Sequence, residues 1–202
     1  MRSRSGSLIF SSEKTALLIL ASVSPRRREI LNALGIDHVA IAPDVDEVSD
    51  GHPEAVVLEN ARRKAEVGLA RSEQRAVALG ADTEVVLDGR VLGKPANERE
   101  ARAFLEALSG RAHEVLTGVA LLGPRDEGAP GRSAVASSSV TFRELDAATL
   151  ERYLASGEWR GRAGAYAIQG LGSILIARLE GDFSNVVGLP VPLLLELAPE
   201  LF

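Results

Sequence analysis

From residue 17 onward, the chain alternates between short apolar runs and amphipathic helical stretches. Residues 17–21 (LLILA) form an apolar run of the kind that a buried strand has. A helical stretch follows at once, with Ser24 as the expected N-cap, Pro25 at the first helical position and Gly35 just past the end. Alternation of this kind predicts an α/β fold.

The alternation continues to the end of the chain, and Asp88-Gly89 predicts a tight hairpin in its middle. Because hairpins and crossover units are mixed, we expect a mixed sheet rather than a purely parallel one. Further strands are expected at residues 38–42, 76–79, 85–87, 90–92, 115–122, 134–142 and 173–179. Further helices are expected from Pro53, from Asn97 with its capping partner Glu100, and at residues 147–155 and 190–197.

Composition excludes several classes of protein. The 202 residues include no cysteine, which rules out disulfides, thiolate zinc sites and cysteine nucleophiles and fits a cytoplasmic location. No apolar run approaches the length of a membrane span, and residues 17–21 are too few for a signal-peptide core. The net charge of −5 argues against nucleic-acid binding, so any phosphate site has to be a local positive pocket. We expect residues 1–16 to be a flexible extension, residues 17–202 a single domain, and residues 123–131 a disordered loop tip.

Three consecutive arginines stand at the start of the first helix. Arg26, Arg27 and Arg28 fall in its first turn, beside the positive end of the helix dipole, where an isolated helix prefers Asp or Glu. Free N–H groups together with guanidinium forks suit an anion, most naturally a polyphosphate. The alternative is a solvated basic turn. Arg26 and Arg27 are the candidates for ligand contact, and Arg28 is the one expected to face solvent.

Carboxylates occur in two places that suit chemistry. Asp82 follows the strand predicted at residues 76–79, and ligand clefts in open α/β sheets lie at such carboxyl ends. A carboxylate there can act as a general base or bind a metal, although a turn-capping role is the alternative. Glu47, near Asp44 and Asp46, could supply oxygen ligands to Mg²⁺, unless the acidic loop is merely solvated.

Other polar residues stand out by their settings. Lys64 flanks the apolar stripe of its helix and could reach into a cleft as a phosphate-binding charge, or lie along the surface. Lys94 precedes a proline that restrains the backbone. Gln169 lies in a run of small residues and could read a base edge, or be exposed in a turn. For His113 we favour a structural role over a catalytic one.

A series of motifs occurs in one order from residue 17 almost to the end: LILASVSPRRREIL (18–31), Asp46-Glu47, ENARRKA (59–65), GADTEVVLDGRVLGKP (80–95), LSGRAHEVLTGVAL (108–121), VTFREL (140–145), SGEWRGRAGAYAIQG (156–170) and VVGLP (186–190). This series closely resembles the Maf-like nucleotide pyrophosphatases, which are related to the house-cleaning inosine triphosphatases. The resemblance implies an inosine-triphosphatase-like α/β fold, with two lobes around a central mixed, twisted sheet and a nucleotide cleft between them. It also implies a cytoplasmic homodimer that binds a nucleoside triphosphate and a divalent cation, Mg²⁺ or Mn²⁺, and no nucleic acid or membrane.

The resemblance also assigns roles to residues. Asp82 matches the proton acceptor, Arg26, Thr83 and Gln169 match positions tied to substrate choice, and the polar residues that line the cleft are Ser22, Arg27, Glu47, Lys64 and Lys94. Glu47 and Asp82 are the predicted metal ligands. The Ala-Ile-Gln-Gly form around Gln169 is similar to that of the subgroup that hydrolyses dTTP and UTP. The resemblance also makes modified pyrimidine nucleotides expected substrates. Glu84 departs from the family's usual aliphatic residue and Val23 from its usual small one.

The expected reaction is hydrolysis of the triphosphate to the monophosphate and pyrophosphate. Two rival functions remain: a nucleotide-binding regulator of division or septum formation with little catalysis, and a phosphatase that releases orthophosphate. The polar cluster fits an enzyme better than a regulator, because binding alone needs no base beside a phosphate clamp.

Overall fold

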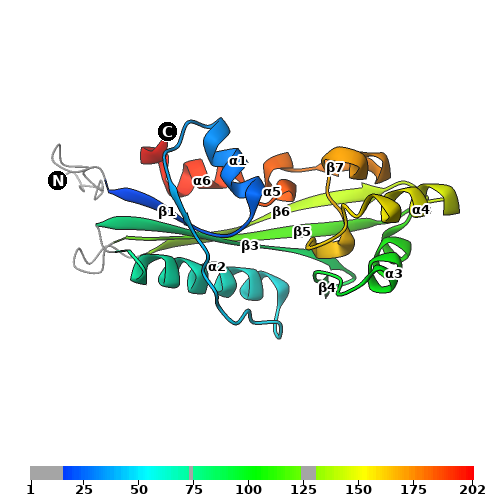
Figure 1. Cartoon of the computed structure of the whole chain (residues 1–202), viewed down its shortest axis with the longest axis horizontal. Helices are drawn as coiled ribbons and strands as arrows, with labels where there is room; N and C mark the ends of the chain where they lie inside the picture. The colour runs from blue at the N-terminus through cyan, green and yellow to red at the C-terminus, as the bar shows by residue number, and fades with distance from the viewer. Residues whose placement is uncertain (1–15, 73–74, 124–130) are drawn as a thin grey trace, which may run out of the picture.

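The computed structural model describes residues 16–72, 75–123 and 131–202, and within them one mixed sheet of seven strands organises the molecule (Figure 1). The strand order is β2-β1-β3-β5-β6-β7, and β4 pairs with β3. β1 runs parallel to β2 and β3, whereas the other pairs are antiparallel, so the predicted mixed α/β sheet is confirmed. The strands are β1 (Leu17–Ala21), β2 (Val39–Ile41), β3 (Ala76–Leu87), β4 (Arg90–Leu92), β5 (Ala112–Leu122), β6 (Arg132–Phe142) and β7 (Ile176–Glu180).

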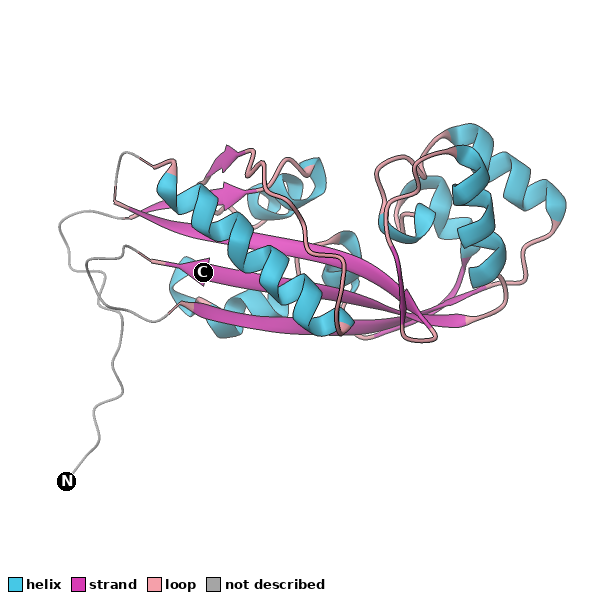
Figure 2. Ribbon diagram, turned by 90° about the horizontal axis from the view of Figure 1, so that it is seen from below, coloured by secondary structure: helices cyan, strands magenta, loops and turns pink. Residues whose placement is uncertain are grey.

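Helices cover both faces of this sheet and form a second lobe at one end. In Figure 1, α2 lies on one face of β1, β3 and β5, and α1, α5 and α6 lie on the other. Figure 2 shows α3 and α4 gathered at the far end of the long strands, which run through both lobes. The helices are α1 (Pro25–Ala33), α2 (Pro53–Ala70), α3 (Glu98–Leu108), α4 (Ala147–Ser156), α5 (Phe183–Val187) and α6 (Val191–Leu197), with short 3-10 turns η2 (Ala163–Ala165), η3 (Gly170–Leu175) and η4 (Pro199–Leu201).

Each lobe has its own core. The second lobe buries Trp159, Tyr153 and Phe142 among the aliphatic residues of α3, α4 and the strand ends. The first lobe is packed differently on its two faces: leucines fill the side of α1 and α6, whereas alanines such as Ala61 and Ala65 fill the side of α2. The two-lobed arrangement predicted from the resemblance is therefore present.

Glycines let α2 lie unusually close to the sheet. A Cβ added to Gly80 of β3 would stand 2.0 Å from the carbonyl oxygen of Ala61, and one added to Gly118 of β5 would stand 2.3 Å from that of Val57. Backbone therefore packs on backbone here, which only glycine permits. This contact fixes the height of α2 above β3, and with it every side chain that α2 directs toward the sheet.

Several predicted elements are confirmed. α1 and α2 begin at Pro25 and Pro53 as expected, and Gly35 follows α1 with φ +70°. The hairpin between β3 and β4 has positive φ at both Asp88 and Gly89, as a tight turn of this kind requires. Asn97 caps α3, because its side chain accepts a hydrogen bond from the backbone N–H of Glu100 at 3.0 Å.

Other predictions were wrong. The expected strands 76–79 and 85–87 are one continuous strand, because β5 pairs with β3 from Ala78 through Val86 and holds the intervening Gly-Ala-Asp-Thr extended. The last strand begins at Ile176 rather than at residue 173, since η3 occupies the residues before it. The short helix α5 was not predicted. Ser24 does stand at the N-cap of α1 as predicted, but its side chain makes no capping hydrogen bond.

Two predictions concern residues outside the described ranges. They are the flexible extension, of which only residue 16 is described, and the disordered loop tip, of which residues 124–130 are not described. Throughout the described ranges, none of the helices has the length and apolar character needed to cross a membrane.

Candidate active site

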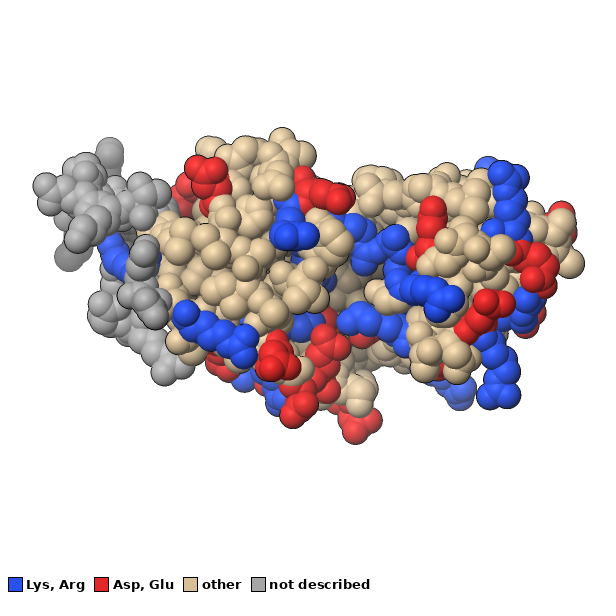
Figure 3. Space-filling model, in the orientation of Figure 1, with Lys and Arg blue, Asp and Glu red and all other residues tan. Residues whose placement is uncertain are grey.

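A pocket of about 300 Å³ opens where β1 stops and β3 continues. The parallel pairing with β1 ends at Gly80, and the pairing with β4 starts only at Val85. Along this edge, the described strands leave the stretch 81–84 of β3 without a neighbour on that side. Figure 3 shows a hollow at the middle of one face of the molecule with Lys and Arg side chains around it. The long strand, and not a strand end, therefore carries Asp82 into the site.

All the residues predicted for the site line this one pocket, although they come from six separate segments. They are Ser22, Arg26 and Arg27 around the start of α1, Glu47 after β2, Lys64 of α2, Asp82 and Thr83 of β3, Lys94 after β4, and Gln169 before η3. Neighbouring residues of a strand point to opposite faces, so Asp82 faces α2 while Thr83 faces α1. The structure thus places the residues together; the role of each stays a prediction.

At the α2 side of the pocket, Lys64 joins two carboxylates. Its Nζ lies 2.6 Å from Oδ1 of Asp82 and 2.5 Å from Oε1 of Glu47. Lys64 is 6% exposed and Asp82 4%, so the alternatives of a surface lysine and a turn-capping aspartate are wrong. Burial by itself would raise the pKa of Glu47, but the hydrogen bond and charge of Lys64, helped by Lys94, outweigh it and lower that pKa.

Asn60 is a residue of this cluster that sequence reasoning missed. Its Nδ2 donates to Oδ2 of Asp82 at 3.1 Å and to the carbonyl of Val48 at 3.0 Å, and its Oδ1 accepts from the N–H of Val48. Asn60 therefore ties the acidic loop to the carboxylate. The signal was available, since Asn60 lies four residues before Lys64 and so on the same face of the helix.

On the α1 side, Arg27 is buried and holds the pocket wall together. Its guanidinium donates to the carbonyl of Gly188 at 2.7 Å, to Oγ of Ser22 at 3.1 Å and to Oγ1 of Thr83 at 3.0 Å. Burial lowers its pKa to about 10, while the charge of Asp82 acts in the opposite direction. Arg27 remains charged at neutral pH, and with three donors used it has two N–H groups left for a ligand.

The hydroxyl of Thr83 belongs to a chain with a fixed direction. Thr117 donates its one hydroxyl hydrogen to the carbonyl of Asn185 at 3.2 Å. The 2.9 Å bond between Thr83 and Thr117 must therefore be donated by Thr83, which also accepts from Arg27. Toward a ligand, Thr83 can then only accept a hydrogen bond.

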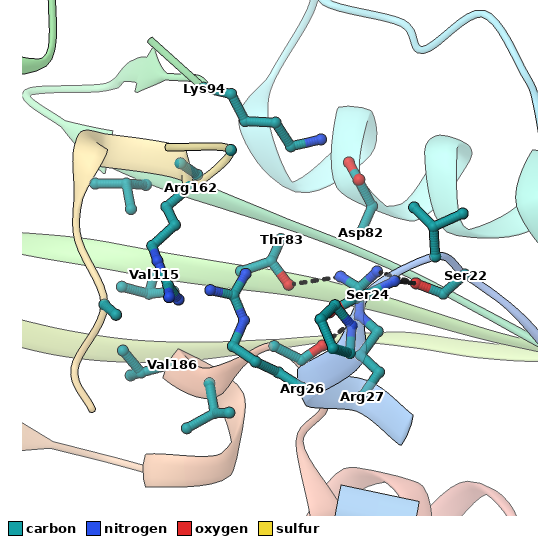
Figure 4. Close-up of a pocket in the computed structure, with 18 of the residues that line it drawn as sticks. Ser22, Ser24, Arg26, Arg27, Asp82, Thr83, Lys94, Val115, Arg162 and Val186 are labelled. Carbon is teal, nitrogen blue, oxygen red and sulfur yellow. Dashed lines mark hydrogen bonds between the residues drawn. The ribbon is translucent and has the colours of Figure 1, made fainter. Parts of the chain in front are cut away.

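The three arginines of the cluster have different surroundings, in agreement with the sequence prediction. Arg28 is exposed and is absent from the pocket lining. Arg26 is half-buried, which lowers its pKa, although Glu29 and Tyr153 act against this. Its Nε is buried and finds no hydrogen-bond partner in the described part of the chain. Arg26 therefore has unused donor capacity inside the pocket (Figure 4).

His113 does not line the pocket: its Nε2 lies 2.8 Å from the hydroxyl of Tyr166 and its ring packs edge-on against Phe142, as a structural histidine would.

Glu84 shares the α2-facing side of β3 with Asp82, and burial, with the negative charge of Asp82, raises its pKa to about 7. The raised pKa is the physical effect of having Glu84 at a position where the sequence resemblance predicts an aliphatic residue.

Sequence reasoning also missed pocket residues from the second lobe. Arg162 and Tyr166 line the pocket together with Gln169, and all of them belong to the motif at residues 156–170. The motif was therefore the available signal, but only its glutamine was assigned a role.

Comparison with known proteins gives a consistent family. Residues 17–201 match the sequence model of the family described as Maf-like protein. A dTTP/UTP pyrophosphatase of Myxococcus xanthus is 48% identical over 87% of this chain and 87% of its own length, and one of Dictyoglomus thermophilum is 43% identical over 86% and 90%. Among solved structures, a HAM1 protein from Coxiella burnetii matches with a TM-score of 0.46 and 22% identity, over 63% of this chain and 73% of that protein.

Proposed function

The chain belongs to the Maf-like proteins, and on that premise we propose that it hydrolyses dTTP and UTP to the nucleoside monophosphate and pyrophosphate. Relatives named for this activity are 43% and 48% identical to the chain over most of its length. The enzyme is then a nucleoside triphosphate pyrophosphatase, and its role is to remove such nucleotides, including modified pyrimidine nucleotides. We propose further that it acts as a homodimer in the cytoplasm. Size-exclusion chromatography with light scattering tests whether the protein is a dimer.

One observation carries the proposal: a buried carboxylate, Asp82, is held in a fixed orientation beside a cationic pocket. Lys64 and Asn60 each bind one of its oxygens, at 2.6 and 3.1 Å. A carboxylate oxygen can accept more than one hydrogen bond, so Asp82 keeps the capacity to accept a proton from water. A general base fixed next to a polyphosphate site is what hydrolysis requires and binding alone does not.

The predicted divalent cation fits the residues present. Glu47 and Asp82 already share one cation, the Lys64 ammonium, so their oxygens converge on a common point. No group of three or more His, Cys, Asp or Glu suited to a metal occurs within the described ranges, so substrate oxygens would complete the coordination. Mg²⁺ is typically bound in this way, by one or two carboxylates plus phosphates. When bound, it would neutralise charge on the phosphate oxygens.

The chain's own residues divide the remaining work. Asp82 accepts the proton of the attacking water, and Lys64 and Asn60 keep its carboxylate aimed at that water. Lys94, which is largely exposed and 3.9 Å from Glu47, is free to move onto the triphosphate. Arg27 holds the opposite wall through Ser22, Thr83 and Gly188. Attack in line at the α-phosphorus then releases pyrophosphate.

The test is a panel of nucleoside triphosphates with Mg²⁺ or Mn²⁺, in which pyrophosphate and orthophosphate are measured separately. Pyrophosphate together with dTMP or UMP is the expected result. Release of orthophosphate would identify a phosphatase instead. If no nucleotide gave any product, the nucleotide-binding regulator would be the remaining function.

The substitution Asp82→Asn tests the base. We expect it to reduce kcat by about a hundredfold or more, the size of a general-base contribution, with the fold intact by circular dichroism. Asp88→Asn is the matched control, because Asp88 is exposed in the β3–β4 turn and pairs with Arg111 at the surface. Equal activity of the two variants would remove Asp82 from the mechanism.

A further inference from the structure

We propose that Arg162 is a specificity-determining residue that, with Arg26, donates hydrogen bonds to the carbonyl oxygens of a 2,4-dioxopyrimidine base. This inference rests on the proposed function and adds a residue of the second lobe to the recognition of the substrate. In Figure 4 the side chains of Arg162 and Arg26 reach into the pocket from opposite walls and point toward each other.

The chain holds Arg162 so that the outer end of its guanidinium faces the pocket. Its Nε donates to the carbonyl oxygen of Glu158, which leaves the two terminal nitrogens without a partner among the described residues. The carboxylate of Glu158 accepts from the backbone N–H groups of Leu171 and Gly172, both at 3.1 Å. Glu158 therefore anchors Arg162 and also the turn that directly follows Gln169. The guanidinium of Arg162 and the backbone turn after Gln169 are therefore held by the same residue.

The surroundings of Arg162 suit a base better than a phosphate. Apolar side chains line the pocket as well, among them Val115, Ile168 and Val186. In Figure 4, Val115 and Val186 lie on the side of Arg26 and Arg162, whereas Asp82 and Lys94 lie on the other side of the view. An apolar wall with a few polar groups is typical of a site for a flat heterocycle. The reacting phosphate belongs at the other end, beside Asp82.

The polar groups at this end also select among bases. A guanidinium has donors and no acceptor, so Arg26 and Arg162 suit the carbonyl groups of uracil and thymine. Cytosine carries an amino donor in place of one carbonyl, which would face a cation that can only donate. The amide of Gln169 can both accept from the ring N–H of a dioxopyrimidine and donate to its carbonyl. A site built on unsatisfied donors rejects a ligand that leaves them unpaired.

The experiment compares UTP with CTP on the full chain with Mg²⁺, for the wild type, Arg162→Gln and Arg160→Gln. Arg160 is the matched control, because its exposed guanidinium lies 4.4 Å from the centre of the Trp159 ring and does not line the pocket. We expect Arg162→Gln to lower kcat/KM for UTP by about tenfold to a hundredfold, the effect of one charged hydrogen bond, and mainly by raising KM. The value for CTP should change little, so the preference for UTP shrinks, and Arg160→Gln should behave as the wild type.

Calorimetry separates this inference from the proposed function. Arg162→Gln should weaken the binding of UMP more than that of CMP and leave the binding of inorganic pyrophosphate unchanged. Equal losses for both bases with weaker pyrophosphate binding would show that Arg162 holds phosphate, and unchanged UMP binding would show that it is solvated; either result overturns the inference. If the wild type cleaves neither nucleotide, the proposed function fails, and the UMP and CMP affinities still decide the role of Arg162.

Discussion

The close approach of α2 to the sheet makes Gly80→Ala the most informative single substitution. A Cβ at residue 80 would lie 2.0 Å from the carbonyl oxygen of Ala61 and 2.7 Å from the backbone nitrogen of Ala65. Ordinary contact needs about 3.4 Å, so α2 would have to move by roughly 1.4 Å. Backbone on both sides means that no side-chain rotation can relieve the contact. Overpacking of this kind costs about 1 to 3 kcal/mol of unfolding free energy.

The same movement reaches the chemistry, because Lys64 lies between Ala61 and Ala65 on α2. Its 2.6 Å contact with Asp82 would lengthen beyond hydrogen-bond distance, and so would the bond from Asn60. A misplacement of about 1 Å can cost roughly a hundredfold in rate. We therefore expect Gly80→Ala to lower both the stability and kcat for UTP.

Urea unfolding followed by circular dichroism measures the first effect, and pyrophosphate release measures the second. The matched control is Gly123→Ala, since a Cβ at residue 123 would meet nothing within 4 Å. The reasoning is refuted if Gly80→Ala is as stable and as active as Gly123→Ala, because α2 would then have room that the described packing denies it.

Two further predictions concern buried charge. Lys64→Met leaves Asp82 buried without its cation and should lower the unfolding free energy by about 3 kcal/mol. Lys94→Met removes one partner of an exposed ion pair and should lower the unfolding free energy by less than about 1 kcal/mol. Equal urea midpoints for the two variants would contradict this. Burial lowers the pKa of His113 from 6.5 to about 4, with a backbone hydrogen bond acting against it, so that below pH 6.5 the unfolded chain takes up a proton that the folded chain does not. Stability should then be fully present above pH 6.5 and fall as the pH drops toward 4, and urea unfolding across this range should show a shallower fall for His113→Phe.

Local sequence signals predicted the elements whose shape is decided locally. Pro25, Pro53, Asp88-Gly89 and Asn97 each act through their own backbone or capping chemistry, and the structure has a helix start or turn at every one. The continuous β3 could not be predicted in this way. Its Gly-Ala-Asp-Thr stretch has turn-like composition, and only the pairing with β5, more than thirty residues later, keeps it extended.

The site shows the same division. The sequence motifs contain the polar residues themselves, so the motifs were enough to predict which of these residues line the pocket. Asn60 and Arg162 were missed because their importance lies in what they touch: Asn60 in the orientation of Asp82, and Arg162 in facing a pocket wall from another lobe. The helical spacing of Asn60 and the motif around Arg162 pointed to their positions, but the contacts themselves depend on the packing of α2 and of the second lobe.

The bond from Arg27 to Gly188 has a consequence for the order of events during synthesis. Its two residues are 161 positions apart, so the wall of the pocket closes only after nearly the whole chain has left the ribosome. Contacts between such distant residues form late, since closing the long loop between them costs conformational entropy. A nascent chain that lacks α5 therefore holds Asp82 and Lys64 but not a finished pocket. We therefore expect nucleotide hydrolysis only once the chain has been synthesised past Gly188.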